Sequence, residues 1–135
     1  MSPHQRNIWP IIVKIARRKQ ARGESFFTTA KKKENKIIRI NPNNIIVQSE
    51  IDEEGNPGGH PRPVSRECLE EAWTILKALG QMNSDDMLSR VSKRNKYART
   101  GAIIRGILFE LPNVRKKIID RKMTLIINRN RRSRT

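Results

Sequence analysis

The sequence predicts an α+β protein made of two modules. Some segments carry apolar residues at helical spacing and others carry short runs of β-branched residues, which are the signals of helices and of strands. Residues 49–63 hold many Gly, Pro and acidic residues, a composition that predicts a linker or long loop. We therefore expect a first module over residues 1–63 and a second over residues 64–135. A chain of 135 residues is long enough for one domain or two very small ones.

A small helix and an antiparallel β-meander are expected in the first module. Isoleucines recur at helical spacing over residues 8–19, and Pro10 suits the first turn of such a helix. Three short runs dense in β-branched residues predict the strands of the meander, over 26–29, 36–40 and 45–48. Residues 41–44, Asn-Pro-Asn-Asn, are a strong turn signal between the last two strands.

Three helices followed by a β-hairpin are expected in the second module. The helices are expected over 65–79, 84–91 and about 96–111, and the hairpin strands over 114–119 and 123–128. Ser65 and Ser84 are suited to cap the first two helices, Gly80 to end the first, and Pro112 to end the third. No strand is expected between the first two helices, and residues 129–135 are expected to form a disordered basic tail.

The distribution of positive charge points to function. The formal net charge is +16, from 29 Lys and Arg against 13 Asp and Glu. Residues 93–135 hold 14 basic and two acidic residues, a net of +12, whereas residues 64–92 hold three basic and five acidic residues, a net of −2. A chain this basic, with its charge concentrated in one third, attracts polyanions, and phosphate backbones are their usual form.

Several other classes are disfavoured by composition. No apolar run approaches the ~20 residues of a membrane-spanning helix, and the N-terminus has no signal-peptide core. The only cysteine, Cys68, cannot form an intramolecular disulfide, which fits a reducing cytosol. With one Cys and two His, His4 and His60, a structural zinc site of the usual Cys/His kind cannot be assembled. We therefore expect a cytoplasmic protein, associated with the nucleoid if bacterial, without cofactor, metal, membrane partner or catalytic site.

The order of elements over about 64–128 resembles the winged helix-turn-helix superfamily. The expected order is helix, short helix, tight turn, longer helix and two-stranded hairpin, and it covers about half of the chain. It departs from the common pattern because a strand between the first two helices is missing. The N-terminal half, in the runs 26–29, 37–40, 45–47 and 63–65, is similar to small DNA-reading domains associated with bacterial restriction systems.

The winged-helix resemblance implies that the third helix enters the major groove and that the hairpin lies against the backbone or the minor groove. The expected DNA-binding residues are basic or amide side chains of this helix, the hairpin and the tail: Lys93, Arg94, Asn95, Lys96, Arg99, Arg115, Lys116, Lys117, Arg121, Lys122, Arg129 and Arg131. Arg and Asn make bidentate contacts to guanine and adenine, so we expect specificity from the helix. A further group of basic residues can equally form a second phosphate-binding patch or plain solvated surface: Arg17, Arg18, Lys31, Lys32 and Lys33.

The adjacent aromatic residues Phe26 and Phe27 carry a separate expectation. On a strand, neighbouring side chains point to opposite faces, so one of the two can be exposed. An exposed Phe offers a stacking surface to a base, although core packing is favoured for this pair. Trp9 and Trp73 are expected to anchor the core because both lie on apolar helix faces.

Sequence-recognising binding of double-stranded DNA is the leading hypothesis, as a regulator or as the DNA-reading module of a restriction or mobile-element system. The first alternative is an RNA-binding or ribosome-associated protein, which the charge and small size fit equally well. The second is a small metal-dependent nuclease using Asp52, Glu53, Glu54 and His60. It is disfavoured because these residues lie in an expected loop, and catalysis needs rigid supports. A homodimer, and a protein partner for the acidic loop over 49–63, are left open.

Overall fold

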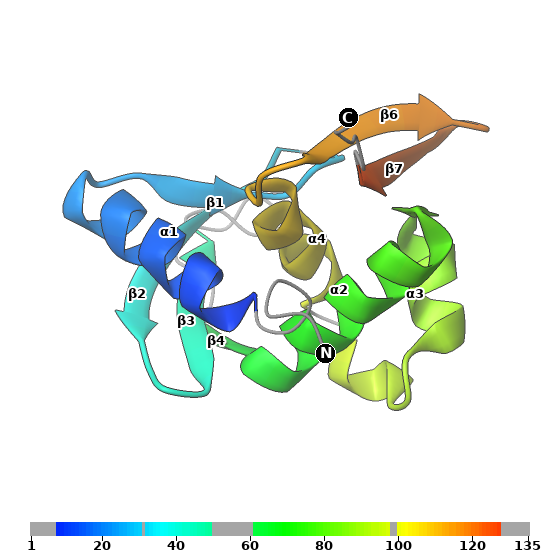
Figure 1. Ribbon diagram of the computed structural model, residues 1–135. Coiled ribbons are helices and arrows are strands. Elements are labelled where there is room, and N and C mark those ends of the chain that lie inside the picture. The colour runs from blue at the N-terminus through cyan, green and yellow to red at the C-terminus, as the bar shows by residue number, and fades with distance from the viewer. Residues whose placement is uncertain (1–7, 31, 50–60, 98–99, 128–135) are drawn as a thin grey trace, which may run out of the picture.

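The computed structural model describes residues 8–30, 32–49, 61–97 and 100–127, with only the backbone described for Lys96 (Figure 1). These ranges form an α+β structure, which confirms the expected fold class. One antiparallel sheet has four strands in the order β1-β2-β3-β4, and a second has three strands in the order β5-β7-β6. The helices lie around and between the two sheets.

The first half contains the expected helix and meander. Helix α1 spans Trp9–Ala21, begins with a proline in its first turn and buries the apolar stripe Trp9, Ile12, Ile15 and Ala16. Strands β1 (Ser25–Phe27), β2 (Glu34–Ile40) and β3 (Asn44–Ser49) pair antiparallel in sequence order. The meander is therefore confirmed, with boundaries shifted by one or two residues.

A fourth strand was not expected from the sequence. Strand β4 (Arg62–Ser65) pairs with β3, with Val64 opposite Ile45, and it lies at the edge of the sheet. The expected module boundary at residue 63 therefore falls inside a strand. Proline favours non-regular structure as a sequence signal, but an edge strand tolerates Pro63 because its outer side has no partner strand.

Local capping signals set the ends of the next two helices. Helix α2 spans Arg66–Leu79; the Ser65 hydroxyl accepts a hydrogen bond from the Cys68 N–H at 3.3 Å, and Gly80 ends the helix with a φ of 81°. Helix α3 spans Ser84–Arg90, but its cap is Asn83, so the expectation of a Ser84 cap is wrong. The Asn83 side chain accepts from the Asp86 N–H at 2.8 Å while the Asp86 carboxylate accepts from the Asn83 N–H at 3.0 Å, and this reciprocal pair satisfies two end donors.

A short strand separates these two helices, so the expectation of none is wrong. Strand β5 (Gln81–Met82) pairs with β7, with Met82 opposite Leu125. Two residues are too few to show an alternating pattern. The strand is recognisable only by its distant partner.

The expected third helix is also revised. Instead of one helix over 96–111, the chain forms the 3₁₀ turn η2 (Arg94–Tyr97) and helix α4 (Gly101–Phe109), and residues 98 and 99 lie outside the described ranges. Helix α4 is apolar on almost every side and packs against α2, β1 and β6. At Gly106 an added Cβ would overlap the carbonyl oxygen of Phe27, so β1 crosses this helix at backbone contact. A helix apolar all round is typical of a core.

The C-terminal hairpin is confirmed with a tighter tip. Strands β6 (Val114–Ile119) and β7 (Lys122–Ile127) pair so that only Asp120 and Arg121 connect them. Both connecting residues have positive φ, 52° and 68°, as a two-residue type I′ turn requires.

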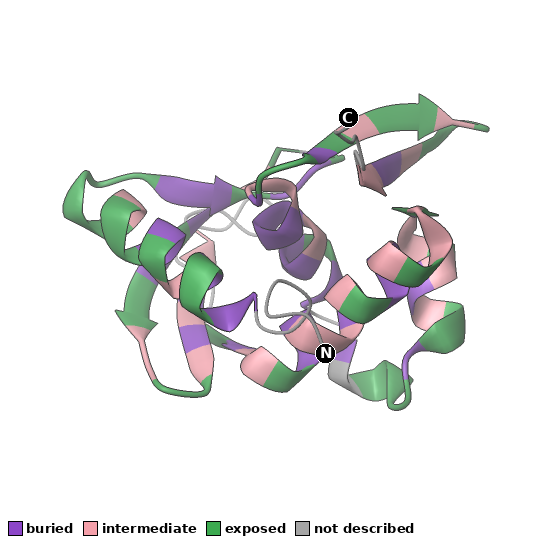
Figure 2. Ribbon diagram, in the orientation of Figure 1, coloured by how far each residue is buried: buried purple, intermediate pink, exposed green. Residues whose placement is uncertain are grey.

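One hydrophobic core contains residues from both halves of the chain. Ile12 and Phe26 from the first half belong to the same buried cluster as Leu69, Ile104 and Leu125 from the second. Figure 2 shows the buried positions gathered on α4 and on the sides of α1, α2 and the sheets that face it. The two sheets are therefore held in one structure around α4.

Candidate nucleic-acid interface

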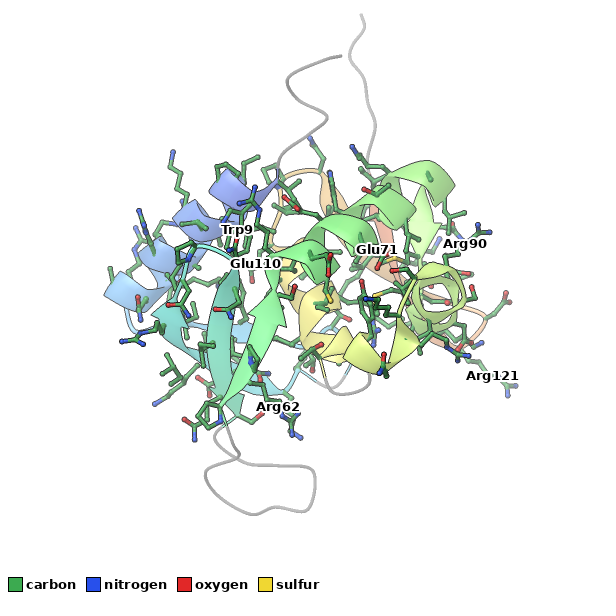
Figure 3. The ribbon with its side chains drawn as sticks, turned by 90° about the horizontal axis from the view of Figure 1, so that it is seen from below. Trp9, Arg62, Glu71, Arg90, Glu110 and Arg121 are labelled. Carbon is green, nitrogen blue, oxygen red and sulfur yellow. The ribbon has the colours of Figure 1, made fainter. Side chains whose placement is uncertain are left out.

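Two segments of the second half present exposed basic side chains. On the hairpin formed by β6 and β7, called the wing below (residues 114–127), the exposed cations are Arg115, Lys117, Arg121 and Lys122. In the segment after α3, which includes η2 and is called the basic connection (residues 91–97), Lys93, Arg94 and Asn95 are exposed. In Figure 1 the wing runs along the top of the molecule and η2 lies at its lower edge, with α3 between the tip of the wing and η2. Figure 3 shows Arg90 of α3 and Arg121 of the wing projecting outward at the end of the molecule away from α1.

The basic connection precedes α4 and does not form its first turn. The expectation that Lys93, Arg94 and Asn95 lie at the start of the long third helix is therefore wrong. On α4 itself Ala102 is exposed and Arg105 is half-buried, while Ile103, Ile104 and Ile107 are buried. The physical reason is the β1 strand at Gly106 and the core around it, which cover the helix.

Glu71 on α2 holds the basic connection at both ends. The Tyr97 hydroxyl donates to Glu71 Oε1 at 2.6 Å, and the Ser92 N–H donates to Glu71 Oε2 at 3.1 Å. Tyr97 is 3% exposed, and burial together with this hydrogen bond raises the pKa of its hydroxyl well above the usual value, so it stays a donor. One carboxylate thus fixes the residues that flank Lys93, Arg94 and Asn95.

Removing the Tyr97 hydroxyl is expected to loosen this arrangement. Tyr97→Phe should lower the free energy of unfolding by about 1.5 kcal/mol, because a hydrogen bond to a charged group is lost and the carboxylate keeps its desolvation cost. Urea denaturation of the parent, Tyr97→Phe, Glu71→Ala and the double variant measures the coupling. The double variant should lose less than the two single losses added together; strict additivity would show that the pair does not interact.

The tip of the wing combines backbone strain with an anchor to α3. Asp120 and Arg121 both have a left-handed backbone conformation. Asp tolerates it, whereas for Arg121 the Cβ is crowded against the backbone and the conformation is sterically unfavourable. Next to it, the Lys122 ammonium forms a salt bridge with the Asp85 carboxylate in the first turn of α3. This pairing lowers the pKa of Asp85 and raises the pKa of Lys122, so both stay charged at neutral pH. Lys122, an expected DNA contact, thus has a partner within the chain.

The strain at Arg121 leads to opposite expected effects on stability and on binding. Arg121→Gly should raise the free energy of unfolding by up to about 1 kcal/mol, since glycine adopts positive φ without the Cβ clash. If the side chain contacts one phosphate of a duplex, as the sequence leads us to expect, the same change should weaken that binding. The slope of log K against log [salt] should then become shallower by about 0.9. Arg121→Ala is the control, because it removes the charge and keeps the strain. Equal stability of the two variants would contradict the strain.

The expected second patch is not assembled as one surface. Arg17 and Arg18 are exposed on α1, while Lys32 is exposed in the loop after β1 and Lys33 is half-buried. Lys32 lies instead in a cleft with Lys116 from the wing, together with Phe27 and Phe109. The sequence pointed to Phe27 but not to Phe109, and it did not indicate that these two rings line one cleft. No sequence pattern connects positions more than 80 residues apart.

Some expected site residues lie outside the described ranges. These are Lys31, Arg99, Arg129, Arg131, the side chain of Lys96, and the acidic loop with Asp52, Glu53, Glu54 and His60. Within the described ranges, no group of three or more His, Cys, Asp and Glu residues could hold a metal ion. Nor does any helix in that part of the chain have the length and apolar character needed to cross a membrane.

Comparison of the chain with known proteins found no relative. No protein-family model matches the chain, and neither the curated proteins nor the solved structures contain a match.

Proposed function

We propose that this protein binds double-stranded DNA through the wing and the basic connection. The observation that carries the proposal is the set of exposed cations on the wing, Arg115 and Lys117 on one face of β6 and Arg121 at the tip. A salt bridge joins the wing to α3, and the basic connection follows that helix in the chain. Cations on a rigid hairpin are suited to phosphates, because they can be held in position before binding.

The order of elements supports the same function. Strand β5 supplies the strand between the first two helices that the winged-helix pattern has and the sequence did not reveal. The three-stranded sheet joins this strand to the hairpin in the order β5-β7-β6. The likeness is one of topology, and it supports a nucleic-acid-binding role for the hairpin.

Base recognition, in this proposal, belongs to the basic connection and not to α4. Arg94 and Asn95 are exposed on η2, and their side chains are the types that pair bidentately with guanine and adenine. Glu71 limits the movement of their backbone from both sides. Asn95→Ala should therefore reduce discrimination between duplex sequences more than it reduces binding to a random duplex.

A salt titration against two nucleic acids tests the proposal. The ligands are a random duplex of about two helical turns and an RNA hairpin of matched length. We expect tighter binding to the duplex, with an affinity that falls steeply with salt, since released counterions drive the association. Tighter binding to the hairpin would favour the RNA-binding alternative, because the A-form major groove excludes protein elements. Binding to neither ligand would reject the proposal.

A further inference from the structure

We propose that the cleft at the root of the wing receives one unpaired nucleobase of the bound nucleic acid. This inference rests on the proposed function and assigns a second, distinct site to it. The cleft has a volume of about 260 Å³ and lies between the end of β1, the loop after it, the end of α4 and the start of β6. Its lining residues are Phe27, Thr28, Thr29, Lys32, Phe109, Glu110 and Lys116.

The walls of the cleft combine aromatic rings with cations. Phe26 is fully buried, whereas its neighbour Phe27 is 45% exposed and lines the cleft, so the alternation of the strand leaves one of the two rings open. Phe109 forms another part of the wall, and the Lys116 ammonium lies 4.9 Å from the centre of its ring. An open aromatic face is a stacking platform for any base, because every base has a π-face.

The two lysines of the cleft, Lys32 and Lys116, suit the phosphate of a nucleotide whose base lies against the aromatic wall. Lys116 Nζ is 3.3 Å from the Thr29 carbonyl oxygen, which holds one ammonium at the cleft, and Lys32 adds a second cation. Glu110 is the acid of the cleft, and its carboxylate is paired at 3.3 Å with Lys19. That carboxylate can accept from the exocyclic amino group of a cytosine, as acidic side chains do in base recognition. Lysines beside an aromatic wall match a ligand with a flat apolar part and an anionic part.

Size and backbone conformation favour a small, specific occupant. The volume is slightly below the ~300–1,000 Å³ of ordinary small-molecule sites, which suits a single base. Lys32 has a φ of 52°, a left-handed conformation that is costly for lysine and is concentrated at ligand-binding sites in general.

The cleft lies where a backbone on the wing can reach it. Strand β6 is an edge strand, and successive side chains point to opposite faces, so Lys116 lies on the face opposite Arg115 and Lys117. A phosphate backbone that follows this edge is within reach of both faces. We infer that the outer face holds the backbone while the cleft takes a base that is not paired.

Three labelled ligands of one sequence test this inference with the full chain. They are a fully paired duplex, the same duplex with one extrahelical base, and the single strand. We expect about tenfold tighter binding to the duplex with the extrahelical base than to the paired duplex, as one stacked base provides. If the single strand competes equally well, the base comes from single-stranded nucleic acid; if it does not, the base comes from an interrupted duplex.

Variants of Phe27 isolate the cleft. Phe27→Ala should abolish the preference for the unpaired base and leave affinity for the paired duplex unchanged, while Phe27→Trp should retain the preference. Ile38→Ala is the matched control, because Ile38 is 46% exposed on the same sheet and does not line the cleft. Absence of a preference in the parent, or an equal loss on paired and unpaired ligands in Phe27→Ala, overturns the cleft assignment and leaves duplex binding standing. Failure of every ligand to bind overturns both proposals.

Discussion

Replacing Arg115, Lys117 and Arg121 together by alanine is expected to weaken duplex binding on the order of a hundredfold near physiological salt. Each cation that meets a phosphate releases condensed counterions, so three lost contacts should also flatten the slope of log K against log [salt] by about 2.7. The fold should change little, because all three side chains are exposed. Fluorescence anisotropy over a range of salt concentrations, with thermal unfolding alongside, measures both effects.

A triple variant on α1 is the matched control for charge. Lys14, Arg17 and Arg18 are exposed on that helix, and replacing them by alanine removes the same three charges from the total of +16. This control should lose only the small, long-range part of the attraction. If both triple variants lose equal affinity, binding follows net charge alone, and the assignment of the wing is wrong. If the α1 variant loses more, the contacts lie at the opposite end of the molecule.

The largest expected effect on stability comes from a single added carbon. Gly106→Ala should lower the free energy of unfolding by about 3 kcal/mol, because the new Cβ would overlap the Phe27 carbonyl oxygen and only a backbone shift can relieve that. Since Phe27 also lines the cleft, the same shift should weaken binding of an unpaired base. Urea denaturation measures the first effect, and competition between ligands with and without an unpaired base measures the second.

Gly101→Ala is the control within the same helix. An added Cβ at Gly101 would lie 3.1 Å from the Met87 methyl, the flexible end of a side chain that can move aside. Alanine is also the better helix former, so this variant should be within about 1 kcal/mol of the parent. Equal stability of the two alanine variants would show that β1 does not press on α4, and the single core around that helix would have to be reconsidered.

Sequence patterns located most elements because their causes are local. The stripe of α1 and the capping of α2 by Ser65 and Gly80 depend on residues within a few positions of one another, and the structure confirms them. The cap of α3 was assigned one residue late, because Ser84 and its neighbour Asn83 are both good capping residues and only the reciprocal bonds with Asp86 distinguish them.

The sequence predicted which types of residue form the candidate site better than it predicted where the fold places them. The charge of the wing followed from the sequence. Core packing, the favoured expectation for Phe26 and Phe27, is right for Phe26, which is fully buried, and wrong for Phe27, which is 45% exposed. The expectation of one exposed basic helix over 96–111 is wrong. A basic run next to an apolar helical pattern does not say which of the two is covered in the fold. The contact of β1 with α4 covers the helix and leaves the basic connection exposed.

The sequence by itself determined the α+β class, the polarity of charge along the chain, and the helices and strands whose signals lie within one turn or one alternating run. Tertiary structure alone decided that α4 is a core helix, that the two residues of β5 form a strand, and that Lys32 and Phe27 meet Lys116 and Phe109 in one cleft. The physical reason is the range of the interactions. Capping and periodicity act between near neighbours, whereas burial, strand pairing and clefts depend on segments that only folding brings together.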